Sequence, residues 1–115
     1  MFERLLPVLP VAEVDAEVAF YAALGFTAAP THTGFTALRS GQVLFGVQRS
    51  EQPVPPAGLA WQIEVTDIRA VHELAVRAHL PVVRGPQVHP VGFWTVQLRT
   101  PSGYLLTFEG PRTAN

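Results

Sequence analysis

Polar side chains recur at alternate positions in three short segments that are otherwise apolar. Gln62 and Glu64 lie in LAWQIEV, Gln97 lies in GFWTVQLR, and Thr107 and Glu109 lie in YLLTFEG. Successive side chains of a β-strand point to opposite faces, so each segment is expected to place these residues on one face. Such groups can orient a small molecule by hydrogen bonds, and a carboxylate in an apolar pocket can also act as a general base. The alternative is a solvated sheet face that binds nothing.

Aromatic residues are candidates for the rest of a pocket wall. In the first half of the chain, alternation places Phe35 and Phe45 toward the same cavity. In the second half, Phe93 and Trp94 follow Gly92, where a β-bulge would exchange which of the two faces inward. Stacking of a planar ligand on such a ring is worth about 1 to 3 kcal/mol, by analogy with nucleobases.

Composition limits the classes of function. The chain has 115 residues, 48% of them hydrophobic and 15% charged, which is enough apolar material for one compact domain. The formal charge of -1 without a basic cluster gives no reason to expect nucleic acid. Cysteine is absent, which excludes disulfides and thiolate metal sites. The first apolar run is broken by Pro7 and Pro10 and is too short for a signal sequence or membrane span, so we expect a soluble, cytoplasmic protein.

Two helices are predicted from apolar periodicity. VAEVDAEVAFYAALGF places Val14, Val18, Tyr21 and Leu24 on one face and ends at Gly25. A second helix is expected in IRAVHELAVRAHL. Asp67, which precedes this segment, is its expected N-cap, and Pro81, which follows it, is expected to end the helix.

A weak internal repeat relates the two halves. RSGQVLFGVQ, residues 39–48, aligns with PSGYLLTFEG, residues 101–110, as a turn followed by an apolar strand. Each half is expected to contain a strand, a helix and two or three further strands. The proline-rich segment EQPVPPAG, residues 51–58, is unsuited to either element and is predicted to connect modules of residues 1–50 and 59–115.

This arrangement resembles the vicinal oxygen chelate superfamily, which includes glyoxalase I, extradiol dioxygenases and bleomycin-resistance proteins. The resemblance rests on the two helical segments and on LRTPSGYLLTFEGP near the end of the chain. It implies an α+β fold: one domain over residues 1–115, with two βαβββ modules forming curled, mostly antiparallel half-barrel sheets and helices outside.

The resemblance also implies four positions for metal ligands, which in the family are usually His, Gln or Glu. They fall on Leu6, Phe45, Ala60 and Thr107. Three of these have no donor atom, and a single threonine hydroxyl cannot hold a divalent ion. We therefore expect no metal and no other cofactor, with Thr107 facing the cavity.

The histidines are the remaining candidates for a metal site. His72 and His79 fall on the second predicted helix, which in the family lies outside the half-barrel, so surface or capping roles are expected. His32 and His89 precede strands and could line the mouth of the cavity, although solvent or loop hydrogen bonds are the simpler expectation. A site with two histidines from separate loops stays open as an alternative.

The leading hypothesis is a metal-free binding protein similar to bleomycin-resistance proteins, which sequesters a planar or aromatic antibiotic-like ligand in the cleft of a homodimer. No membrane or nucleic-acid partner is expected, and the nearly neutral charge argues against bleomycin itself. No catalytic residue is assigned. The expected ligand-binding residues are Phe35, Phe45, Gln62, Glu64, Phe93, Trp94, Gln97, Thr107 and Glu109.

Two other classes stay open. One is a lyase, isomerase or dioxygenase of the same superfamily, with an atypical metal site or with Glu64 or Glu109 as general base. The other is a scaffold or regulatory domain whose cavity is filled by side chains. Metal content distinguishes the enzyme from the binding protein, and a solvent-accessible cavity distinguishes both from the scaffold.

Overall fold

The computed structural model describes residues 1–52, 59 and 61–112. The chain divides into two compact units, Met1–Pro55 and Pro56–Asn115, and each is described by itself. Most of the predicted connector lies outside the described residues. Neither described helix has the length and apolar character of a membrane span.

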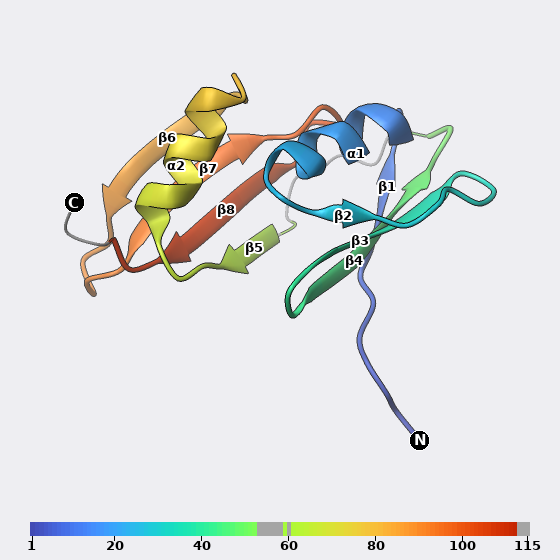
Figure 1. Cartoon of the computed structure of the whole chain (residues 1–115), viewed down its shortest axis with the longest axis horizontal. Coiled ribbons are helices and arrows are strands. Elements are labelled where there is room, and N and C mark those ends of the chain that lie inside the picture. Colours follow the sequence, from blue (N-terminus) through green and yellow to red (C-terminus); the bar gives the residue numbers. More distant parts are fainter. Residues whose placement is uncertain (53–58, 60, 113–115) are drawn as a thin grey trace. The chain divides into compact units, whose positions relative to one another are not determined.

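The first unit is a four-stranded sheet with one helix (Figure 1). Its strands lie in the order β1-β4-β3-β2, with β1 parallel to β4 and the other neighbours antiparallel. The helix contacts β2, β3 and β4. Its elements are β1 (Val8–Val11), α1 (Val14–Ala23), β2 (Thr27–Ala28), β3 (Phe35–Ser40) and β4 (Val43–Arg49).

The second unit repeats this plan, with the strand order β5-β8-β7-β6 and α2 against β6, β7 and β8 (Figure 1). Only β5 and β8 are parallel. Its elements are β5 (Trp61–Glu64), α2 (Ile68–Arg77), β6 (Val82–Val88), β7 (Trp94–Arg99) and β8 (Leu105–Gly110). Two βαβββ modules of an α+β fold are therefore confirmed.

The two helices begin differently. The Asp67 side chain accepts a hydrogen bond of 3.1 Å from the backbone N–H of Arg69, as the predicted N-cap requires. Glu13 occupies the same position before α1 but makes no side-chain capping bond. A side chain thus accepts a hydrogen bond from a backbone N–H in the first turn of α2, whereas the N-cap residue of α1 accepts none.

The buried face of α1 agrees with the predicted one at Val14 and Tyr21 and differs from it at the other two positions. Glu17 and Phe20 are buried, whereas Val18 and Leu24 are only half-buried. The reason is the adjacent pair of aromatic rings: Phe20 and Tyr21 both pack inward, with centroids 5.2 Å apart in an edge-to-face arrangement. Their size sets the orientation of the helix.

The prediction that Phe45 faces a cavity is wrong. Its ring is fully buried between the sheet and α1, with centroids 4.8 Å from Tyr21 and 5.6 Å from Phe26. Phe45 lies opposite Leu38, whereas Phe35 lies opposite Gln48, so the two phenylalanines point to opposite faces of the sheet. Only Phe35 is on the face away from α1.

The length of a turn explains this error. Four residues separate the paired Arg39 and Leu44, whereas five separate the paired Arg99 and Leu105. The sequence repeat aligns Phe45 with Thr107, but the strand registers make Gly46 the counterpart of Thr107. One extra residue in a turn reverses the face of every following side chain.

Candidate functional site

The sheet of the second unit carries polar side chains on the face away from α2. Residues that oppose one another in neighbouring strands share a face, so the strand registers define two rows across the sheet. The first row is Gln62, Thr107, Gln97 and Arg84. The second row is Glu64, Glu109, Thr95 and Gln87.

An irregularity in β6 brings Gln87 into the second row. Arg84 opposes Gln97 and Gln87 opposes Thr95, so β6 has one more residue than β7 between these pairs. Gly85, with φ +98°, lies inside this bulge. A Cβ on Gly85 would come to 2.4 Å from the Thr95 carbonyl oxygen, so the close approach of the two strands requires glycine.

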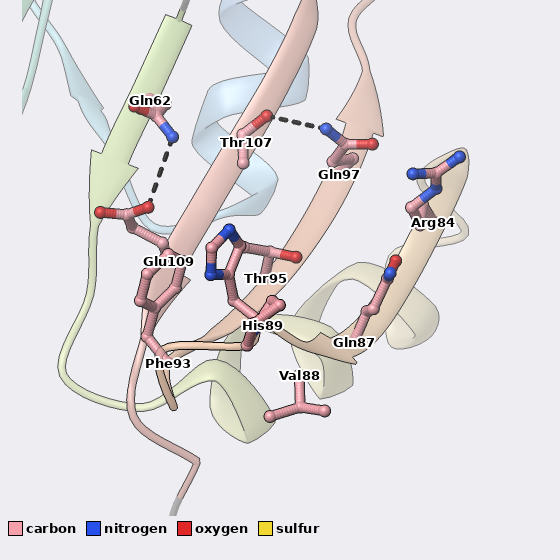
Figure 2. Close-up of a pocket in the computed structure, with 11 residues that line it drawn as sticks. Gln62, Arg84, Gln87, Val88, His89, Phe93, Thr95, Gln97, Thr107 and Glu109 are labelled. Atoms are coloured by element: carbon pink, nitrogen blue, oxygen red, sulfur yellow. Dashed lines mark hydrogen bonds between the residues drawn. The ribbon is translucent and has the colours of Figure 1, made fainter.

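A pocket of about 320 Å³ opens on this face (Figure 2). The structure places five of the residues expected to bind a ligand in its wall, which supports the predicted sharing of a face. These residues are Gln62, Phe93, Gln97, Thr107 and Glu109.

The pocket wall has further residues, which come from β6, from the turn that follows it and from β7. They are Arg84, Gln87, Val88, His89, Pro90 and Thr95. Sequence reasoning named His89 as a residue that could line the mouth of the cavity, but it assigned none of the others to the site. A Gly-Pro pair inside an apolar strand is a recognised signal for a bulge, so the sequence offered one indication that alternation fails in β6.

Four expected site residues do not line this pocket. Glu64 shares the face and lies opposite Glu109, but it is outside the pocket wall. Trp94 points to the other face, where the Arg112 guanidinium lies 4.9 Å from the ring centroid. Phe35 and Phe45 belong to the first unit.

The aromatic side of the pocket is a stacked pair. The imidazole of His89 lies parallel to the ring of Phe93, with centroids 4.4 Å apart and an interplanar angle of 11°. The turn between β6 and β7 fixes the pair, because the His89 N–H donates to the Phe93 carbonyl over 2.7 Å. The Val91 N–H donates a long hydrogen bond of 3.4 Å to His89 Nδ1.

The polar side of the pocket is ordered by two hydrogen bonds (Figure 2). Gln97 Nε2 donates to Thr107 Oγ1 over 3.2 Å, which leaves Gln97 Oε1 as an acceptor and the Thr107 hydroxyl proton as a donor. Gln62 Nε2 donates to Glu109 Oε2 over a long 3.4 Å. The wall can therefore both donate to and accept from a ligand.

The sheet of the first unit presents a different surface on its corresponding face. Phe35 lies across Gly46, and a Cβ on Gly46 would come to 2.5 Å from the Phe35 ring. Val8 opposes Gly46 in β1, and Ala37 opposes it in β3. Phe35 thus covers the position that Thr107 occupies in the second unit.

A divalent metal does not fit the residues that the structure describes. Among them, no three or more His, Asp or Glu side chains come together in a group that could hold an ion. Of the four positions that the resemblance implies, Leu6 has no donor atom, Phe45 is fully buried against α1, and Ala60 lies outside the described residues. Hard and borderline ions need several oxygen or imidazole ligands, and the Thr107 hydroxyl alone is not such a set.

Solved structures share this fold. A bleomycin resistance determinant encoded on the transposon Tn5 is 18% identical, with a TM-score of 0.77 and coverage of 97% of this chain and 100% of that one. A bleomycin-binding protein complexed with bleomycin is 19% identical, with a TM-score of 0.78 and coverage of 96% and 100%. A glyoxalase/bleomycin resistance protein/dioxygenase from Alicyclobacillus acidocaldarius is 19% identical, with a TM-score of 0.80 and coverage of 95% and 91%.

At these identities the likeness establishes the fold alone. No protein among those with curated functions matches the sequence. The family model for the Glyoxalase/Bleomycin resistance protein/Dioxygenase superfamily, however, matches residues 4–108, nearly the whole length. The chain belongs to the glyoxalase/bleomycin resistance protein/dioxygenase superfamily.

Proposed function

We propose that this protein binds a planar, antibiotic-like small molecule in the pocket of its second unit and sequesters it without chemical conversion. The observation that carries the proposal is the combination of the His89–Phe93 stack with an ordered polar wall in one pocket. Small-molecule sites are commonly built from an apolar or aromatic surface and a few convergent polar groups. The bleomycin-binding relative of the same fold is consistent with this role.

Ligand capture is tested by calorimetric titration with a panel of planar antibiotics. Phe93→Ala removes the half-buried ring of the stacked pair, and loss of an aromatic anchor costs about 2 kcal/mol, roughly thirtyfold in affinity. Trp94→Phe is the matched control, because the adjacent ring lies on the other face of the sheet. Equal affinity in the parent and Phe93→Ala proteins would remove this pocket from the proposal.

A second candidate is an enzyme that uses Glu109 as general base. The observation in its favour is that the half-buried Glu109 carboxylate lies in the pocket wall, where its Oε2 accepts a hydrogen bond of 3.4 Å from the Gln62 amide. Glu64 is the weaker candidate for this role because it lies outside that wall. Conversion of a bound ligand by the parent protein, abolished in Glu109→Gln with binding retained, would establish the enzyme.

The proposal includes a homodimer. Apolar side chains ahead of β1 are strongly exposed, including Phe2 at 95% and Leu5 at 84%, and exposed apolar surface of this kind often marks an association site. We expect sedimentation velocity at micromolar concentration to show a dimer, and Phe2→Glu combined with Leu5→Glu to shift it toward monomer. A parent protein that sediments only as a monomer would contradict this part of the proposal.

A further inference from the structure

The charged groups of the pocket lie on opposite sides of it. Arg84 lies in β6, the strand at one edge of the sheet, whereas Glu109 lies in β8 (Figure 2). β7 separates these strands, and neighbouring strands lie about 4.8 Å apart, so the two backbone positions are on the order of 10 Å apart. The pocket therefore has a basic side and an acidic side.

The acidic side has a second carboxylate beside it. Glu64 lies directly opposite Glu109 in the parallel pair of β5 and β8 and shares its face. Like charges at opposed positions repel each other, and within the described part of the chain no cation neutralises either of them. A ligand cation placed against Glu109 would relieve this repulsion as well as form its own charged hydrogen bond.

The basic side is arranged to donate hydrogen bonds. Arg84 opposes Gln97 in the first row, and the bulge at Gly85 places Gln87 beside it in the second row. No carboxylate among the described residues pairs with the Arg84 guanidinium. A guanidinium has five N–H donors in a planar fork that matches a carboxylate, and the Gln87 amide adds two more.

We propose that the pocket selects an amphoteric ligand: a planar ring system with a carboxylate on the side that Arg84 binds and an amine on the side that Glu109 binds. This inference rests on the proposed function, because the ring would lie against the same His89–Phe93 pair. A ligand with one charge leaves the opposite protein charge partly desolvated and unpaired, which weakens its binding.

Four naphthalene probes separate these contributions. They share one bicyclic ring and carry both charges (6-aminomethyl-2-naphthoate), the anion (2-naphthoate), the cation (2-naphthylmethylamine) or neither (2-naphthylmethanol). Calorimetry should show that the amphoteric probe binds about tenfold more tightly than either singly charged probe, because it alone pairs with both Arg84 and Glu109; tenfold corresponds to about 1.4 kcal/mol.

Two substitutions assign the charges to their partners. Arg84→Gln should weaken the amphoteric probe about tenfold and leave the cationic probe unchanged, whereas Glu109→Gln should weaken the amphoteric probe and leave the anionic probe unchanged. Arg77→Gln and Glu73→Gln on α2 delete the same charges outside the pocket and should change none of the four affinities.

The outcomes distinguish this inference from the proposed function. If all four probes bind equally and Phe93→Ala weakens them all, ring capture stands and the amphoteric ligand is refuted. A preference for the amphoteric probe that persists in Arg84→Gln and Glu109→Gln also refutes it, because other residues would then recognise the charges. If no probe binds at millimolar concentration, both the inference and the capture of planar ligands by this pocket fail.

Discussion

The two units have the same order of helices and strands. Their sheet faces away from the helix differ, however, because one is largely apolar and the other is polar. At matched register positions, Val8 corresponds to Gln62 and Ala37 corresponds to Gln97. Gly46 corresponds to Thr107. The first face is thus largely apolar and partly covered by Phe35, whereas the second hydrogen-bonds across its strands. Topology fixes where a site can form, and the side chains decide which of the two units forms it.

The largest expected effect is the loss of an aromatic ring from the core of the first unit. Phe45→Ala should lower the free energy of unfolding by about 3 to 5 kcal/mol, because a fully buried phenylalanine leaves a cavity beside Tyr21 and Phe26. Chemical denaturation measures the change, and Val76→Ala, which shortens a 55% exposed side chain, is the control. A loss below about 1 kcal/mol would return Phe45 to the list of possible ligand contacts.

A smaller effect on stability is expected at Gly46, the counterpart of Thr107 on the first face. It tests whether the Phe35 ring excludes a side chain at this position. Gly46→Ala should destabilise the protein by about 1 to 2 kcal/mol, because the new methyl group collides with the Phe35 ring. In a Phe35→Ala background the same change should become neutral or stabilising, since alanine suits a strand better than glycine. Equal effects in both backgrounds would show that Phe35 does not cover Gly46 in solution.

The helix N-termini offer a further contrast. Asp67→Ala should cost about 1 kcal/mol of unfolding free energy, because it removes the acceptor for the Arg69 N–H. Glu13→Ala should cost close to nothing, because Glu13 forms no such bond. Thermal denaturation of the two variants side by side checks the difference, and equal losses would argue against the capping role of Asp67.

The smallest expected effect is that of metal removal. Elemental analysis after dialysis against a weak chelator should find no stoichiometric divalent ion, and the chelator should not change ligand affinity, because the described residues of neither unit offer an adequate set of ligands. One tightly bound zinc, nickel or iron ion per chain would contradict the binding-protein proposal and favour the enzyme.

Periodicity and turn residues were sufficient to predict the order of helices and strands in each half, and the family resemblance supplied the fold. Each helix ends near a residue with positive φ, and Asp67 caps α2 as its position predicts. The turns at Gly41 and Gly103 also fall where the repeat places them, with φ of +57° and +94°. These features depend on local sequence, which a single chain reveals.

Only some of the residues in the pocket wall could be predicted by the same reasoning. Alternation correctly grouped Gln62, Gln97, Thr107 and Glu109, because β5, β7 and β8 are regular. It failed for Phe45, where a turn is one residue shorter, and it gave no face for Gln87, which a bulge in β6 brings into the second row. A change of one residue in a turn or bulge reverses the face of a strand and has little signature in composition.

The central claim is that the second unit, and not the first, carries the ligand site. Heteronuclear NMR of the labelled protein during titration with 2-naphthoate tests it directly, because each glutamine side-chain amide gives its own signals. We expect the shifted resonances to be those of Gln62, Gln97 and Thr107, with saturation at one probe per chain. Shifts centred instead on Phe35, Ala37 and Gln48 would place the site on the first unit and contradict the account.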